Sequence, residues 1–255
     1  MLDPNVRARI EKFAAVFHSY VCNVSSVDLI PDTKRYRKIL YFSFLEALSK
    51  ARYPTRRSGD AFSSFVVTYC RWADGDKVSL PHLVAALERT ADPAFEDLRK
   101  FAYPELKNWG SGGPLWIDRD LEKAEVQQRW PKNDAGAALK IPELDLDWAD
   151  LQHRNLLYSY RSKLSHESRH PTISFEEPSD QQPYYESVQR LGNSNTEWHL
   201  VYPCAFLASA CRTGIEGLKT WLMAESKDPY EQFLFGRFLI EKLNDPSIAV
   251  QNPFA

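Results

Sequence analysis

The chain has 255 residues, of which 44% are hydrophobic, 13% aromatic and 26% charged, and its formal net charge is −2 at pH 7. This composition is that of a globular protein and excludes an intrinsically disordered chain. The small net charge gives no whole-chain argument for a nucleic-acid partner, so such an argument has to rest on local clusters of charge.

The cysteines and the apolar segments bear on the cellular compartment. The four cysteines lie far apart in apolar segments and form no C-x-x-C pair. This spacing favours buried thiols over a disulfide framework. The N-terminus shows no basic region followed by an apolar run, and no stretch approaches the ~18 apolar residues of a membrane span. We therefore expect a cytoplasmic protein with no membrane segment.

Apolar residues at spacings of three and four predict four helices in the first part of the chain, over residues 6–21, 32–51, 60–72 and 79–90. Pro54 disfavours helix at the residue before it and so ends the second helix. Ser79 is expected to cap the fourth helix, with Pro81 in its first turn.

Residues 104–146 are rich in glycine, proline and charge, which predicts a long irregular excursion with one helix over 115–129. The same stretch is compatible with a domain boundary. We favour a single domain over residues 1–255, because neither half alone shows a complete set of helical faces to bury.

The second half of the chain is expected to contain more helices and one hairpin. A helix is predicted over 147–165 with Asp147 as its cap, and a β-hairpin over 184–202 around a Gly-Asn-Ser-Asn turn. Two further helical patterns cover 207–222 and 230–243. The sequence therefore predicts a mainly α protein, a helical bundle with a small β-hairpin between the 147–165 helix and the C-terminal helices.

Several kinds of site are excluded by their absent motifs. The sequence has no G-x-x-x-x-G-K-[ST], G-x-G-x-x-G, H-E-x-x-H or G-x-S-x-G pattern. His166 and His170 have a metal-compatible spacing, but Pro171 follows at once and no further histidine or cysteine is near. We predict neither a metal nor a cofactor.

The stretch "YRSKLSHES", Tyr160 to Ser168, combines an arginine and a histidine at the predicted end of a helix. RNA cleavage by the substrate's own 2′-hydroxyl needs a base, an acid and a fixed cation on the phosphorane. Histidine and arginine supply these groups. On an unbroken helix Arg161 and His166 would lie roughly 140° apart, so they can cooperate if the helix ends near Ser165. The alternative is a structural helix terminus.

The run "RSKLSH" matches the R-x(4-6)-H motif of the HEPN superfamily, and "YRSKLSHES" resembles its R-N-x-L-A-H-E form with Ser162 in place of Asn. The resemblance implies an all-α bundle and a metal-independent endoribonuclease that acts as a symmetric dimer. It assigns His166 as general base or acid, Arg161 as the phosphate-stabilising cation and Ser162 to the polar position. Such proteins occur in bacterial toxin–antitoxin, anti-phage and restriction-associated systems.

Other residues are candidates for support or for RNA contact. Glu46, in the mostly apolar 32–51 helix, could orient Arg161 or His166, or could pair with Lys50 one turn on. The candidate RNA contacts, which could instead be exposed helix surface or bundle packing, are Arg154, Asn155, Tyr158 and Lys163. Eight basic residues and one acid lie between Lys34 and Arg57, and the cluster Lys34–Lys38 within this patch could neutralise phosphates or be a solvated surface.

The favoured function is therefore a cytoplasmic, metal-independent HEPN-type endoribonuclease, a homodimer of a bacterial defence or toxin–antitoxin system. Its expected partners are RNA and an antitoxin or another defence-system protein. The alternative is a non-catalytic HEPN-like module that uses the same surface to bind RNA or a protein. A purely structural helical protein would hold Arg161 and His166 apart and away from any groove.

Overall fold

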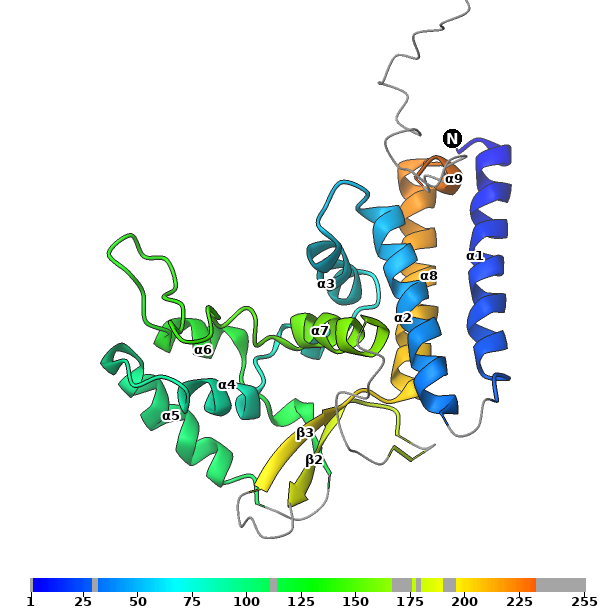
Figure 1. Cartoon of the computed structure of the whole chain (residues 1–255). Coiled ribbons are helices and arrows are strands. Elements are labelled where there is room, and N and C mark those ends of the chain that lie inside the picture. Colours follow the sequence, from blue (N-terminus) through cyan, green and yellow to red (C-terminus); the bar gives the residue numbers. More distant parts are fainter. Residues whose placement is uncertain are drawn as a thin grey trace, which may run out of the picture.

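The computed structural model describes residues 2–28, 32–110, 114–166, 176–177, 180–189 and 196–232. Helices α1 (Pro4–Val24), α2 (Thr33–Arg52) and α8 (Cys204–Glu225) lie side by side along one side of the molecule (Figure 1). Each buries a stripe of apolar residues, such as Phe13 and Phe17 of α1 and Phe42 and Leu45 of α2. The predicted helices over 6–21, 32–51 and 207–222 are confirmed.

Helix α3 (Ser58–Thr68) packs beside α2 and is shorter than the predicted 60–72 helix. Arg71 has a φ of 55°, a left-handed conformation that cannot continue a right-handed helix. The chain passes instead through a 3-10 turn, η1 (Ala73–Asp76), and Trp72 is buried with its ring centroid 5.0 Å from that of Phe206.

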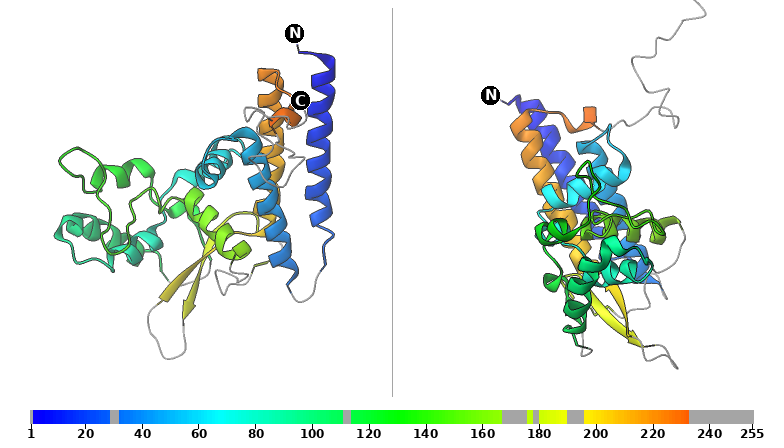
Figure 2. Two further views of the ribbon diagram at one scale, coloured as in Figure 1. Left: turned by 45° about the horizontal axis from the view of Figure 1, so that its top comes forward. Right: turned by 90° about the vertical axis from the view of Figure 1, so that its left-hand side faces the viewer.

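Helices α4 (Leu80–Leu87), α5 (Glu96–Lys107) and α6 (Lys123–Arg129) lie on the far side of the molecule from α1 (Figures 1 and 2). The Ser79 cap is confirmed, since its hydroxyl accepts a hydrogen bond from the backbone N–H of His82. A 3-10 turn, η2 (Pro93–Phe95), leads into α5. Helix α5 continues through Pro104, where the irregular excursion was expected to begin. Pro104 lies on the exposed side of α5, where water can satisfy the carbonyl that the proline leaves without a helical donor.

The excursion at 104–146 contains more regular structure than predicted, and of the single helix expected over 115–129 only residues 123–129 are helical, as α6. Leu115–Trp116 form strand β1, and a 3-10 turn, η3 (Ile117–Arg119), follows before α6 begins. Leu115 and Ile117 are both buried and stand two residues apart, which is a strand spacing and not a helical one. Leu121 and Val126 of the excursion are also buried in the hydrophobic core.

Helix α7 (His153–His166) begins six residues later than the predicted 147–165 helix. Asp147 does not cap it: its carboxylate accepts from Ala149 N at 2.7 Å within a local turn. Backbone pairing replaces helix in the residues that follow, because Ser79 N donates to Leu151 O and His153 N donates to Lys77 O, both at 3.0 Å.

Strands β2 (Tyr184–Gln189) and β3 (Thr196–Val201) form the predicted antiparallel hairpin, with Tyr184 opposite Val201. Strand β1 adds a third, antiparallel strand along β2, which the sequence did not predict. The fold is mainly α with a small sheet. Of the predicted 230–243 helix, only the start falls within α9 (Pro229–Gln232), and the rest lies outside the described residues. Among the described helices, none has the length and apolar character to cross a bilayer.

Candidate active site

Arg161 and His166 lie in the last turns of α7, and the structure brings their side chains together. Arg161 Nη1 lies 3.0 Å from His166 Nε2. His166 is the last described residue of α7, and its ring reaches back toward the arginine. The side chain of Arg161 is largely buried, at 14% exposure, whereas His166 is exposed to solvent.

The direction of this contact sets the role of the histidine nitrogen that faces Arg161. A guanidinium can only donate hydrogen bonds, so in this contact His166 Nε2 is the acceptor. The site therefore presents His166 as a base, next to a fixed positive charge.

Glu46 on α2 completes the arrangement from the other side. Arg161 Nη2 donates to a carboxylate oxygen of Glu46, and the Glu46 side chain is 25% exposed. Figure 1 shows α7 lying across α2, which is what brings residue 46 to the arginine. The alternative pairing with Lys50 is not the one found, because Lys50 Nζ donates to the Arg56 carbonyl at 3.0 Å. Glu46 and His166 thus hold the guanidinium between them.

Tyr158 lies under the arginine and is packed into the bundle. Its ring centroid is 5.8 Å from Arg161 Cζ and 5.6 Å from the ring of Phe62 on α3. A Cβ on Gly59 would lie 3.1 Å from the Tyr158 ring, so α3 approaches this tyrosine closely. The tyrosine therefore supports the position of Arg161 and joins α7 to α3.

The other candidate RNA contacts stand apart from the pair. Arg154 precedes Arg161 by seven residues, about 10 Å along the helix, and it forms an ion pair with Asp76 at 2.9 Å. The Asn155 amide donates to the Ala149 carbonyl and accepts from the Ser63 hydroxyl, both at 2.7 Å. These contacts fasten the beginning of α7. Ser162 is half-buried and Lys163 is exposed, and both follow Arg161 directly along α7.

With this geometry established, the chain was compared with protein-family models, curated proteins and solved structures. No match was found in any of the three.

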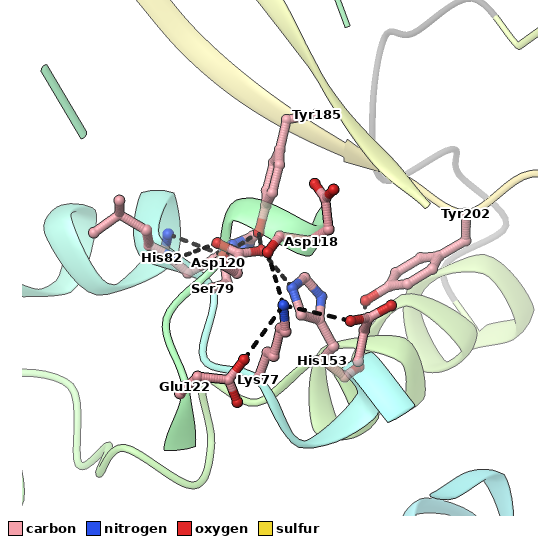
Figure 3. Close-up of polar contacts among 11 residues, drawn as sticks. Lys77, Ser79, His82, Asp118, Asp120, Glu122, His153, Tyr185 and Tyr202 are labelled. Atoms are coloured by element: carbon pink, nitrogen blue, oxygen red, sulfur yellow. Dashed lines mark hydrogen bonds and ion pairs between the residues drawn. The ribbon is translucent and has the colours of Figure 1, made fainter. Parts of the chain in front are cut away.

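A second polar cluster, which the sequence did not indicate, is centred on Asp120 (Figure 3). Its carboxylate accepts from Leu80 N at 2.7 Å and from the Tyr185 hydroxyl at 2.8 Å, and it lies 2.6 Å from His153 Nε2. The Ser79 hydroxyl continues the network, 2.6 Å from the Tyr185 hydroxyl. No motif could have shown this cluster, because residues 79–80, 120, 153 and 185 are separated from one another by more than 30 residues and lie at the ends of different elements.

The composition of the second cluster, with serine, histidine and aspartate, is that of many nucleophilic sites, but its burial argues for a structural role. Ser79, His153 and Tyr185 are each 0% exposed, so no substrate can reach them. Burial also raises the pKa of the Tyr185 hydroxyl well above its usual value, and the Asp120 charge raises it further. The hydroxyl therefore stays protonated as a hydrogen-bond donor, and the cluster joins α4, α7 and β2.

Proposed function

We propose that the protein is a metal-independent endoribonuclease of HEPN type, with Arg161 and His166 as its catalytic residues. The observation that carries the proposal is the 3.0 Å contact between Arg161 Nη1 and His166 Nε2, at the exposed end of α7. It places an imidazole nitrogen next to a cation. These are the base and the phosphate-stabilising charge that attack by a 2′-hydroxyl requires.

In the proposed reaction, Arg161 Nη1 leaves His166 for the substrate phosphate, and the freed lone pair of His166 Nε2 takes the proton from the 2′-hydroxyl. The 2′-oxygen then bonds to the adjacent phosphorus, and the bond from phosphorus to the 5′-oxygen breaks. Arg161 stabilises the negative charge of the phosphorane between these steps. The departing 5′-oxygen takes up a proton, which leaves a 2′,3′-cyclic phosphate and a 5′-hydroxyl. By resemblance to HEPN proteins, the His166 of a second copy supplies that proton across a symmetric dimer.

Glu46 acts in this proposal as a positioning residue. It does not contact the substrate; its carboxylate holds one edge of the Arg161 guanidinium. A cation fixed before the substrate binds costs no reorganisation in the transition state. Ser162 occupies the polar position after the arginine, and the exposed Lys163 follows it along α7. The cytoplasmic setting, the antitoxin and the role in bacterial defence belong to the same proposal and rest on the resemblance.

The test is incubation of the purified protein with single-stranded RNA and transfer RNA in EDTA, next to Arg161→Ala and His166→Ala. We expect wild type to leave 2′,3′-cyclic phosphate ends and each variant to lose at least about 100-fold in rate. Glu46→Gln should lose less, with kcat falling while the products stay the same. His18→Ala is the matched control, since His18 lies on α1 and contacts Glu216 at 2.6 Å. Equal activity in all variants would rule out this site.

One observation favours the alternative, a non-catalytic module that binds RNA or a protein. Arg161 already contacts the carboxylate of Glu46, which offsets the positive charge that a phosphate would meet. If folded wild type leaves RNA intact in EDTA and with added divalent cations, yet retains it in a binding assay, the binding module replaces the ribonuclease.

A further inference from the structure

Cationic and aromatic side chains alternate at the C-terminal end of α2. Arg56 Cζ lies 4.1 Å from the ring centroid of Tyr53, and Arg52 Cζ lies 4.5 Å from the same centroid. Arg52 Cζ is also 3.9 Å from the ring of Trp221 on α8, and Lys227 Nζ is 5.1 Å from that ring. The loop after α2 and the C-terminal end of α8 meet at this end of the bundle (Figure 1).

The positive charges at this end have no carboxylate partner among the described residues. We call them the basic corner, defined as Lys50, Arg52, Arg56, Arg57 and Lys227. In the part of the chain that the structure describes, none of them forms an ion pair with a carboxylate, whereas Arg154 and Arg161 both do. Among the acids near them in sequence, Asp60 and Glu225 are exposed, and Asp228, next to Lys227, is buried and paired with Arg9 at 2.5 Å. A cation held by a ring face keeps its full charge and loses side-chain freedom before any ligand arrives.

The basic corner adjoins the Arg161–His166 pair. Lys50 lies one turn beyond Glu46 on α2, about 6 Å along the same face. On the other side, Gly59 follows Arg57 by two residues and lies against Tyr158, the tyrosine under Arg161. The loop of residues 53–57, which carries Tyr53 and Arg56 of the ladder of rings and cations, thus connects the end of α2 beyond Glu46 with the start of α3 beside Tyr158. A polyanion that reached Arg161 would have the basic corner in its path.

We propose that the basic corner binds the phosphates of a single-stranded RNA whose neighbouring phosphate lies at Arg161. The identity of that strand as a substrate rests on the proposed function. Unpaired positive charges on a strip this close to the pair attract a polyanion, and guanidinium groups suit phosphate oxygens. Arg56, Arg57 and Lys227 are exposed, so phosphates can reach them. An acidic protein would meet the same charges and is the competing occupant.

The experiment measures binding of a fluorescein-labelled, 2′-O-methylated RNA oligonucleotide by anisotropy over a series of salt concentrations. All proteins carry His166→Ala, so no cleavage interferes. The double variant Arg56→Ala/Arg57→Ala should bind about tenfold more weakly or worse near 50 mM salt. Its salt slope should fall by about 1.4, because each phosphate of a single strand that a basic side chain neutralises adds about 0.7 to the slope.

The matched control is Arg7→Ala/Lys12→Ala, which removes the same charge from exposed positions on α1. An equal loss of affinity in both double variants, or no loss in either, would overturn the basic corner as an RNA site. The RNA site would also be overturned if a polyglutamate of equal charge bound as tightly as the RNA and lost as much affinity in Arg56→Ala/Arg57→Ala. That result would assign the surface to an acidic protein.

Failure of the proposed function is separately visible. In the background with an intact His166, the corner variant should cleave a dinucleotide at the wild-type rate and a long RNA with a raised KM. Wild type could cleave no RNA while binding of the oligonucleotide is still weakened by Arg56→Ala/Arg57→Ala. That result would reject the proposed ribonuclease and support the RNA-binding surface. If wild type and Arg56→Ala/Arg57→Ala cleave long RNA with the same KM, the RNA-binding role of the basic corner is rejected and the proposed ribonuclease is not.

Discussion

At the scale of single residues, the fold moves the pKa of His82 far from the ordinary value of a histidine. Its Nδ1 lies 2.7 Å from the Ser79 hydroxyl on the buried side of α4. Burial lowers the pKa of His82 from 6.5 to about 4, and repulsion from His153 and Lys163 adds to this, against a smaller opposite effect of Asp120. The ring therefore stays neutral at pH values where a free histidine is charged.

This lowered pKa predicts acid sensitivity. Between pH 6.5 and about 4 the unfolded chain binds a proton at His82 and the folded chain does not, so stability is present above pH 6.5 and is lost as pH falls. The loss is at most ~3 kcal/mol, and the partial exposure of the ring reduces it. Urea unfolding at pH 7 and pH 4.5 should show a smaller difference in His82→Asn than in wild type. The same difference in both proteins would contradict the assignment.

At the scale of elements, Asp120 holds together parts of the chain that local sequence does not join. Its carboxylate accepts the backbone N–H of Leu80 at the start of α4 and contacts His153 at the start of α7. The third partner, Tyr185, comes from β2. A buried carboxylate with three partners is stable only while all of them are present, because each unsatisfied group carries its full desolvation cost.

We therefore expect Asp120→Ala to lower the free energy of unfolding by ~3–5 kcal/mol. Asp120→Asn keeps the shape and one acceptor oxygen, so its cost should be smaller. Asp118→Ala, two residues away and exposed, should change stability by less than ~0.5 kcal/mol. Chemical denaturation followed by circular dichroism measures all three. A cost for Asp120→Ala no larger than that for Asp118→Ala would show that the network is not what holds these elements.

The same elements show what sequence could and could not predict. Long periodic stretches predicted α1, α2 and α8, because an apolar stripe at helical spacing has one way to be buried. The 115–129 and 147–152 segments were predicted as helix, but Leu115 pairs with Tyr185 and Val78 pairs with Gln152 across the fold. Such pairings override local propensity and leave no local signal.

The candidate site divides in the same way. Arg161 and His166 are five residues apart, so a motif can show them together. Glu46 could be named only as a charge in an apolar helix, and the crossing of α2 by α7 is what gives it a partner. The Asp120 cluster and the ladder of rings from Tyr53 to Lys227 depend on the ends of distant elements meeting. No residue spacing in the sequence predicts these tertiary contacts.

At the scale of the whole molecule, a buried ion pair connects the three-helix side to the chain that follows the candidate site. Lys38 Nζ of α2 lies 2.6 Å from Glu176 Oε2, and the two side chains are 4% and 8% exposed. The other oxygen of Glu176 accepts from Cys204 N at 2.6 Å, at the first residue of α8. The chain that leaves α7 at His166 is thus fixed again ten residues later, at Glu176, against both α2 and α8.

Removal of Lys38 alone should lower the free energy of unfolding more than removal of both Lys38 and Glu176. Lys38→Met leaves the Glu176 charge buried and unpaired, so we expect a loss of ~3–5 kcal/mol. The double variant Lys38→Met/Glu176→Gln should recover part of that loss, although Cys204 N keeps a weaker acceptor. Denaturation of the two single variants and the double variant gives the coupling between the residues. Additive losses would mean that the two charges do not stabilise each other.

The pair also predicts an alkaline limit to stability. Burial alone would lower the pKa of Lys38, but Tyr160 and Glu176 outweigh it, and the pKa is raised above 10.5. A raised pKa in the folded state gives a stabilisation that is complete below pH 10.5 and is lost as pH rises through the higher value. Wild type should therefore lose stability above pH 10.5 more steeply than Lys38→Met/Glu176→Gln. Parallel curves for the two proteins would place the alkaline sensitivity elsewhere, for instance at the buried tyrosines.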